Sequence, residues 1–454
     1  MPMSERATVI RHAATVLAGQ LAVMAFGVTD TIVAGRHAEA SLAALSIGSA
    51  IFVSVYVALM GLLQALLPVW AEQRGAKNPA LIGASFRQAL YVCAAASLLG
   101  MAILLSPQAL LEWTDVPPPL RPAVTGYLAI LAMALPPALL FRMYSTLNQA
   151  LGRPQLVTWL QVAALFVKLP LSIWFTFGGA GVPSMGVQGC AWATLAVNYT
   201  LLGLGLWLLR TQSLYAPLRL WQLLERPDLQ QMAAFARLGI PAGLAIAVEV
   251  TSFTLMALFI ARQGTLASAG HQIASNVAAV LYMVPLSLAI AVSARVSFWR
   301  GAGDEARARA TVWIGFRLSA FISIALAAIL LIAKYAIAGV YSTQPEVVLL
   351  SASLLGWVAL YHLADALQTV CVFVLRSYRI TVGPLVVYCV LLWGGGLGGG
   401  YVLAYHGVGP WQASHSPLSF WLASTLALAV TAAAFAWILR RVVNRPAAAP
   451  LPVQ

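Results

Sequence analysis

Charged residues are scarce in this sequence, and their scarcity excludes a soluble globular protein. Only 9% of the 454 residues are charged, whereas 61% are hydrophobic. A soluble chain of this length would carry about 25% charged residues. The apolar residues lie in long continuous runs rather than in weak alternation, which excludes a membrane β-barrel. The composition therefore indicates an all-α protein that crosses a membrane many times.

Cysteine and histidine are also sparse and scattered. The four cysteines fall in apolar runs without a CxxC pair, so we expect buried apolar side chains rather than a metal or redox site: Cys93, Cys190, Cys371 and Cys389. The six histidines form neither HExxH nor HxxxD. An integral-membrane enzyme such as an acyltransferase would need a nucleophile or a metal cluster, so we expect neither enzyme activity nor a cofactor.

Apolar runs of spanning length recur along the chain, since a helix needs about 20 apolar residues to cross a bilayer. The N-terminus has no signal-peptide cleavage pattern, so the first run is expected to remain as a helix. Twelve transmembrane helices are predicted, at residues 14–34, 44–67, 88–110, 124–147, 155–177, 187–209, 238–260, 271–293, 312–333, 348–373, 382–405 and 418–439.

The basic residues predict the orientation of these spans. With the N-terminus in the cytoplasm, 21 of the 26 Lys and Arg belong to inside segments, four to outside segments, and Lys168 to a span. Such a bias follows the positive-inside rule and places both termini in the cytoplasm. It also explains the net charge of +13 without any nucleic-acid partner. We expect a multi-pass protein of a bacterial inner membrane.

The chain carries an internal repeat at an offset of 226 residues. Arg74-Gly75-Ala76 matches Arg300-Gly301-Ala302, and Arg36 and Arg153 match Arg262 and Arg379. The longest internal hydrophilic segment, 210–237, separates six spans from six. We therefore predict two six-helix lobes related by pseudo-two-fold symmetry: an N-terminal lobe at 1–209, a cytoplasmic linker at 210–237 and a C-terminal lobe at 238–454.

Three acidic residues fall inside predicted spans, namely Asp30, Glu249 and Asp365, and Lys168 of the fifth span joins them. A charge at that depth costs several kcal/mol unless it is paired, protonated or hydrated, so each marks a candidate functional site. Lys168 is a possible ion-pair partner of Asp30. Glu249 and Asp365 can bind a hard cation such as Na⁺, with the Tyr361 hydroxyl as a third oxygen ligand, or share a proton. A structural hydrogen bond from Tyr361 to Asp365 is the plainer alternative, because they lie four residues apart on one helical face.

Several segments resemble the MATE (multidrug and toxin extrusion) transporters of the NorM type, and the similarity extends over nearly the whole chain. The segments are VTDTIVAG at 28–35, GLLQALLPVWAEQRGAK at 61–77, LGIPAGLAIAVEVTSF at 238–253, GHQIASNVAAVLYMVPLSLA at 270–289, RGAGDEARAR at 300–309 and ADALQTVCVFVLRSYR at 364–379. The resemblance implies two lobes around a V-shaped cavity, alternating access, and export of cationic or amphipathic organic compounds in exchange for Na⁺ or H⁺.

The resemblance also implies roles for particular residues. Glu249, Asp365, Tyr361 and Asp30 match cation-coupling positions. Gln272 matches a polar position near the C-lobe site, and Gln368 is a further substrate-cavity candidate. Phe26 and Tyr282 are aromatic candidates for lining that cavity on residue type alone, and helical spacing and lipid contact explain most aromatics equally well. Where relatives tend to carry asparagines, this chain has Lys168 and Ser172, and an ammonium beside Asp30 would compete with an incoming cation. We therefore expect coupling through the C-lobe.

Three alternatives to a monomeric efflux antiporter stay open. A lipid-linked precursor flippase would be expected to show a strongly basic cavity, whereas three of the four residues Asp30, Lys168, Glu249 and Asp365 are acidic. An acyltransferase lacks its motifs, as described above. A channel fits less well than alternating access with a six-plus-six repeat.

Overall fold

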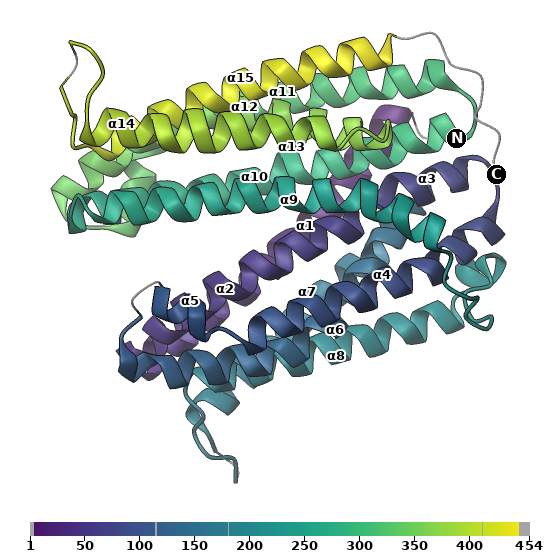
Figure 1. Ribbon diagram of the computed structural model, residues 1–454, viewed down its shortest axis with the longest axis horizontal. Coiled ribbons are helices and arrows are strands. Elements are labelled where there is room, and N and C mark those ends of the chain that lie inside the picture. The colour runs from purple at the N-terminus through teal and green to yellow at the C-terminus, as the bar shows by residue number, and fades with distance from the viewer. Residues whose placement is uncertain (1–3, 114–115, 180, 411, 445–454) are drawn as a thin grey trace. The chain divides into compact units, whose positions relative to one another are not determined.

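The computed structural model describes residues 4–113, 116–179, 181–410 and 412–444 (Figure 1). Nearly all of these residues are helical. The elements are α1 (Glu5–His37), α2 (Glu39–Gln64), α3 (Leu67–Gly75), α4 (Pro79–Leu105), α5 (Gln108–Trp113), η1 (Pro118–Leu120), α6 (Arg121–Ala150), α7 (Gln155–Phe177), α8 (Val187–Thr211), η2 (Ser213–Leu218), α9 (Leu229–Ala261), α10 (Thr265–Gly301), α11 (Glu305–Tyr341), α12 (Pro345–Ser377), α13 (Val382–Tyr388), η3 (Cys389–Gly398), α14 (Gly399–Tyr405) and α15 (Pro417–Val443).

Twelve helical segments within the described residues are long and apolar enough to cross a membrane, which confirms the predicted number of spans. Most of them extend beyond the apolar run that predicted them. The helix α10, for example, continues to Gly301, past Arg295 and Arg300. The third span was predicted too long at its end: α4 stops at Leu105 because Pro107 disfavours helical geometry at Ser106.

The chain divides into two compact units. One comprises Thr15–Gly243, and the other comprises Leu244–Gln454 together with Met1–Ala14. The boundaries lie inside α1 and α9, so each of these two helices belongs partly to one unit and partly to the other. Residues 445–454 of the predicted C-terminal lobe lie outside the described residues.

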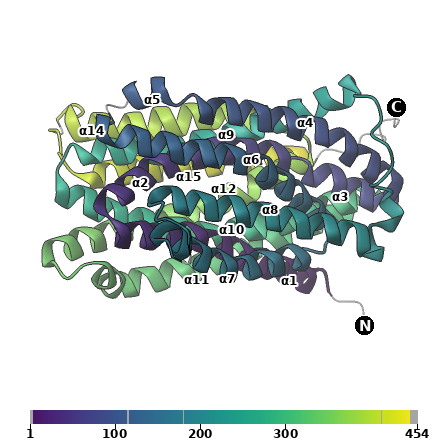
Figure 2. The same ribbon diagram turned by 90° about the horizontal axis from the view of Figure 1, so that it is seen from below.

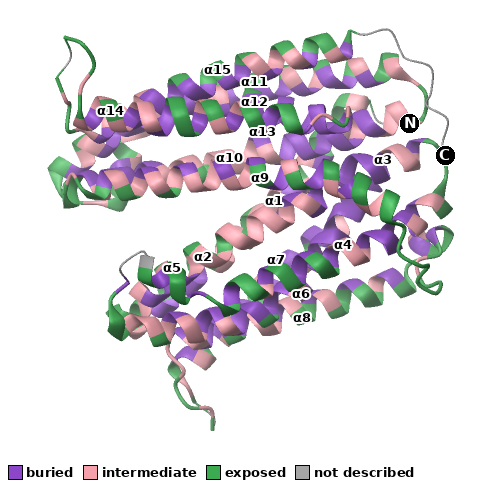
Figure 3. Ribbon diagram, viewed as in Figure 1, coloured by how far each residue is buried: buried purple, intermediate pink, exposed green. Residues whose placement is uncertain are grey.

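Each unit is built around one strongly buried helix. In the Thr15–Gly243 unit, α6 packs against α2, α4 and α8, and its neighbour α8 is visible beside it in Figures 1 and 2. In the other unit, α12 packs against α10, α11 and α15. Buried residues follow α6 and α12 along their length (Figure 3). These two helices carry Arg142 and Asp365, which are discussed below.

The sequence repeat corresponds to a repeated local structure. Asn78 caps α4 by accepting a hydrogen bond from the Leu81 amide at 3.1 Å, and Asp304 caps α11 by accepting one from the Arg307 amide at 2.9 Å. The residue before each cap has a positive φ, 56° at Lys77 and 75° at Gly303. These pairs are 226 residues apart, as the sequence predicts.

The same repeat fixes the last turn of each central helix. The Arg74 guanidinium donates to the carbonyl oxygen of Ala150 at 3.2 Å, at the end of α6. The Arg300 guanidinium donates to the carbonyl oxygen of Ser377, at the end of α12. Each arginine thus satisfies a helix-terminal carbonyl that has no partner within its own helix.

The segment predicted as a linker is bound to its own unit. Arg87 of α4 pairs with Glu225 and donates to the carbonyl oxygen of Arg219 at 2.8 Å. The Gln88 side chain bonds to the backbone of Arg226 and of Asp228. Residues 229–237 already belong to α9, so the predicted linker is shorter than expected.

Glycines allow close helix contact in the eleventh span. A Cβ atom at Gly400 would lie 2.7 Å from Cδ1 and 2.9 Å from Cα of Phe420 in α15. The preceding segment η3 has π-helical turns, which widen the helix locally. Cys389, the first residue of η3, is half-buried and not fully buried as predicted.

The first turn of α1 is held by an ion pair in the Leu244–Gln454 unit. Glu5 accepts from Arg295 Nε at 2.7 Å and from Arg295 Nη2 at 2.6 Å, and Trp299 Nε1 donates to it at 3.1 Å. This two-pronged geometry is the stronger form of a carboxylate–arginine contact. It accounts for the grouping of residues up to Ala14 with the second half of the chain.

We predict that Glu5→Gln lowers the melting temperature of the purified protein, with a loss of about 1–2 kcal/mol, because the partly buried Arg295 loses its charged partner. The matched control is Glu39→Gln. Glu39 is also an acid in a first helical turn, but it is exposed. Equal effects of the two substitutions would mean that the contact with Arg295 contributes nothing beyond the helix dipole.

Candidate functional site

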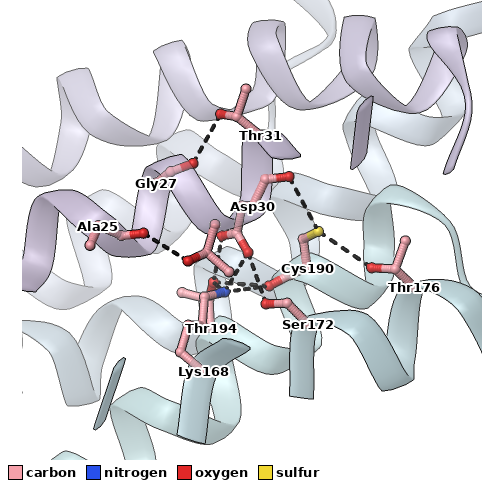
Figure 4. Close-up of polar contacts among 10 residues, drawn as sticks. Ala25, Gly27, Asp30, Thr31, Lys168, Ser172, Thr176, Cys190 and Thr194 are labelled. Atoms are coloured by element: carbon pink, nitrogen blue, oxygen red, sulfur yellow. Dashed lines mark hydrogen bonds and ion pairs between the residues drawn. The ribbon is translucent and has the colours of Figure 1, made fainter. Parts of the chain in front are cut away.

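Asp30 lies in a polar cluster made by α1, α7 and α8 (Figure 4). It is buried, with 8% of the residue exposed. Its carboxylate forms an ion pair with Lys168, whose Nζ is 2.8 Å from Asp30 Oδ1. The structure therefore contains the ion pair considered from the sequence.

The Lys168 ammonium is fully satisfied. Besides Asp30, it donates to the carbonyl oxygen of Cys190 at 3.1 Å and to Thr194 Oγ1 at 2.6 Å. An ammonium has three N–H donors, and each of these three has a partner. Only 1% of Lys168 is exposed. Its ammonium group therefore occupies the place beside Asp30 that a free cation would otherwise take.

Hydroxyl groups complete the surroundings of the Asp30 carboxylate. Ser172 Oγ donates to Oδ1 at 3.0 Å, and Thr194 Oγ1 lies 3.5 Å from Oδ2. Lys168 and Ser172 are four residues apart in α7, as are Cys190 and Thr194 in α8, so each helix presents two groups on one face.

A glycine brings α7 and α8 close enough to form this cluster. A Cβ atom at Gly189 would lie 2.5 Å from the backbone carbon of Phe175, so any larger residue would push the helices apart. Gly189 immediately precedes Cys190, whose carbonyl accepts from Lys168. The close packing of α7 and α8 thus positions the ion pair of Asp30 and Lys168.

We predict that Lys168→Met lowers the melting temperature strongly, by a destabilisation of about 3–5 kcal/mol, because it leaves the buried Asp30 carboxylate without a counter-charge. The double variant Asp30→Asn with Lys168→Met removes both charges and should recover most of the loss. Lys334→Met serves as the control for removing a lysine that forms no such pair. A double variant as unstable as Lys168→Met would contradict the ion-pair account.

The second acidic cluster lies in the Leu244–Gln454 unit. Asp365 of α12 is buried, and its Oδ1 accepts a hydrogen bond from Gln368 Nε2 at 2.9 Å. Gln368 in turn bonds to Thr369 Oγ1 at 3.1 Å and accepts from the Tyr388 hydroxyl of α13. Gln368 therefore connects Asp365 to Tyr388.

Glu249 of α9 is half-buried and differs from Asp365 in its partners. Among the described residues, no hydrogen bond or ion pair involves its carboxylate. It lies close enough to Asp365 and to Arg376 to interact electrostatically with both. Two carboxylates in one low-dielectric region resist joint ionisation, so a proton or a cation is favoured there.

Tyr361 does not make the hydrogen bond to Asp365 that a helical i, i+4 spacing allows. It is buried and packs edge-on against Phe253 and Trp421, with ring centroids 5.8 Å apart in both cases. It still lies within electrostatic range of Asp365 and Glu249. Gln368 makes the hydrogen bond to Asp365 instead, because it lies one turn further along α12.

The other candidates differ in their proximity to the acidic pair. Tyr282 of α10 is half-buried and interacts electrostatically with Glu249 and Asp365. Gln272 is exposed, and its amide donates to Asn276 Oδ1 at 3.2 Å rather than to either acid. Phe26 is half-buried in α1, in the same helix as Asp30.

Sequence reasoning missed Arg376, the basic residue beside the acidic pair. The positive-inside count assigned it to the cytoplasmic boundary, yet only 3% of it is exposed. Its guanidinium carbon lies 4.4 Å from the ring centroid of Phe373, and it interacts electrostatically with Glu249 and Tyr388. The available signal was that Arg376 follows the long apolar run VCVFVL without an intervening polar residue.

The described residues contain no group of three or more His, Cys, Asp and Glu side chains that could hold a metal ion. The acidic pair offers two carboxylates and nearby phenol oxygens, which suit a proton or a weakly held monovalent cation. Such an ion would be transported cargo rather than a resident metal.

Twelve membrane-length helices, a repeat with matching caps and buried acids in both units define a multi-pass membrane protein of the secondary-transporter class. The MatE family model matches residues 16–174 and 241–402, one segment in each half. The chain belongs to the MatE family.

Named relatives and solved structures agree with this assignment. The chain is 35% identical to a probable multidrug resistance protein NorM of Aromatoleum aromaticum, over 96% of this chain and 94% of the relative. It is 31% identical to the multidrug resistance protein PmpM of Pseudomonas aeruginosa, over 94% and 89%. In fold it is similar to the eukaryotic MATE transporter AtDTX14, with a TM-score of 0.83, 22% identity and 97% coverage of both chains.

Proposed function

We propose that this protein is an efflux antiporter that exports small cationic or amphipathic organic compounds in exchange for Na⁺ or H⁺ by alternating access. Membership of the MatE family and the names of the NorM and PmpM relatives support export of such compounds. The observation that carries the coupling mechanism is the Glu249–Asp365 pair, in which one carboxylate is hydrogen-bonded and the other has no partner among the described residues.

The unequal partners of the two acids suggest distinct roles. Asp365 is held in place by Gln368, so it positions the bound ion. Glu249 is free to accept a proton or to coordinate Na⁺, and the arriving charge changes the local balance with Arg376. A change of one charge in a buried region can shift the equilibrium between two helix arrangements. An organic cation that needs the same negative charge would be released at that moment.

The other unit contributes differently. Asp30 is neutralised by Lys168, so it has little residual charge to attract a second coupling ion. Entry of a cation at Asp30 would require Lys168 to move away from three partners. We therefore assign the coupling ion to Glu249 and Asp365, with Tyr361 and Tyr282 lining their surroundings.

The charge pattern and the relatives support a proposal for the membrane and the orientation in which the protein resides. We propose a monomer in a bacterial inner membrane with both termini in the cytoplasm, and with the lobes separated within 210–237. Its only partners are then the lipid bilayer and the transported small molecules.

We predict that Glu249→Gln abolishes the gradient-driven uptake of ethidium into inverted membrane vesicles. The glutamine amide does not take up a proton, and it has no negative charge with which to bind a coupling cation. Sodium and pH gradients are imposed separately, and wild type should respond to one of them. Glu39→Gln, which changes an exposed acid outside the pair, should leave uptake unchanged.

Two outcomes would contradict the proposal. Full gradient-driven uptake by Glu249→Gln would exclude this acid from coupling. Uptake by wild type under neither gradient would favour a flippase, and lipid-linked precursors would then be the next compounds to test.

A further inference from the structure

Arg142 is a buried arginine that the coupling mechanism does not use. It lies in α6, and only 6% of it is exposed. Its Nε and Nη2 atoms are buried and have no hydrogen-bond partner among the described residues. No carboxylate pairs with it there, and its electrostatic interaction is with the phenol of Tyr56 in α2, which is no counter-ion at neutral pH.

The Arg142 guanidinium borders a small polar cavity within the Thr15–Gly243 unit. Side chains of α1, α6 and α7 surround this cavity, together with Pro154. Its lining consists of Val16, Gln20, Arg142, Ser145, Gln149, Pro154, Val157, Thr158 and Gln161. No acidic residue belongs to this lining. The cavity thus combines one full positive charge with several amide and hydroxyl groups.

A lone buried guanidinium is costly, because desolvation of the charge is offset by neither a counter-charge nor hydrogen bonds. Within this unit the other buried cations are paired, Lys168 with Asp30 and Arg87 with Glu225. Arg142 departs from that pattern. Its counter-charge is therefore best supplied from solution.

Side chains around the cavity can point hydrogen-bond donors at a bound anion. Gln149 Nε2 donates to Ser145 Oγ at 3.3 Å, while Gln149 Oε1 has no partner among the described residues. Turning this amide over lets Ser145 donate to Oε1 and points Nε2 into the cavity. Gln20 and Gln161 carry amide donors as well, so an anion would meet amides and a guanidinium but no carboxylate.

We propose that the Arg142 cavity is a binding site for a small monovalent anion of the halide class, with chloride as the physiological candidate. The space has room for about one water-sized particle, so a halide, which is only slightly larger than water, fits it better than sulfate or phosphate does. The site is separate from the Glu249–Asp365 pair, which belongs to the other unit.

The test is the melting temperature of the full-length protein in detergent, measured in potassium gluconate, chloride and bromide at fixed ionic strength. A ligand that binds only the folded state raises the melting temperature, here by about 3 °C at saturating chloride. We expect chloride and bromide to stabilise wild type relative to gluconate. Sulfate at matched ionic strength stabilises proteins non-specifically, so its effect should be the same in wild type and in Arg142→Met.

Two variants locate the response. Arg142→Met should abolish it, whereas the control Arg87→Met should keep it, because Arg87 already has Glu225 as its partner. If Arg142→Met does not fold, Arg142→Lys tests the site instead. Its flexible ammonium should require about tenfold more chloride for the same rise in melting temperature.

The proposal is wrong if wild type melts at the same temperature in gluconate and chloride. It is also wrong if Arg142→Met responds to chloride as wild type does, since the anion would then bind elsewhere. Equal chloride midpoints for wild type and Arg142→Lys would likewise contradict it.

Discussion

A charge buried within a membrane protein must be neutralised, hydrogen-bonded or exchanged with solution, and this constraint accounts for the arrangement of the polar groups here. Lys168 and Asp30 meet it permanently, because each neutralises the other. Glu249 does not, since its carboxylate lacks a hydrogen bond or ion pair among the described residues and lies near a second acid. We propose that the permanently neutral cluster is structural and that the incompletely compensated one responds to an ion.

The two halves of the chain therefore share a scaffold but differ in chemistry. The caps at Asn78 and Asp304 and the contacts of Arg74 and Arg300 repeat at the same offset, so the helices end and turn alike. The buried charged residues do not repeat in this way. The position equivalent to Arg142 is Gln368, which bonds to Asp365, so the same place in the repeat carries a charge in one unit and a neutral amide in the other.

Much of the fold was predictable from sequence. Long apolar runs mark the membrane spans, and charged residues mark the loops between them. The number of spans and the repeat follow from such patterns, whereas the pairing of Asp30 with Lys168 was one of the alternatives that the sequence left open. The surroundings of the acidic pair were less predictable. The bond from Gln368 to Asp365 and the burial of Arg376 depend on how α12 packs against its neighbours, and a positive-inside count treats any arginine near a span end as exposed.

We propose that the coupling ion binds at Glu249 and Asp365 and not at Asp30. The most direct measurement counts the protons or labelled sodium ions bound per molecule of purified protein. The account predicts one coupling cation for wild type and for Asp30→Asn combined with Lys168→Met, and none for Glu249→Gln. Binding that survives in Glu249→Gln and is lost in the double variant would contradict it.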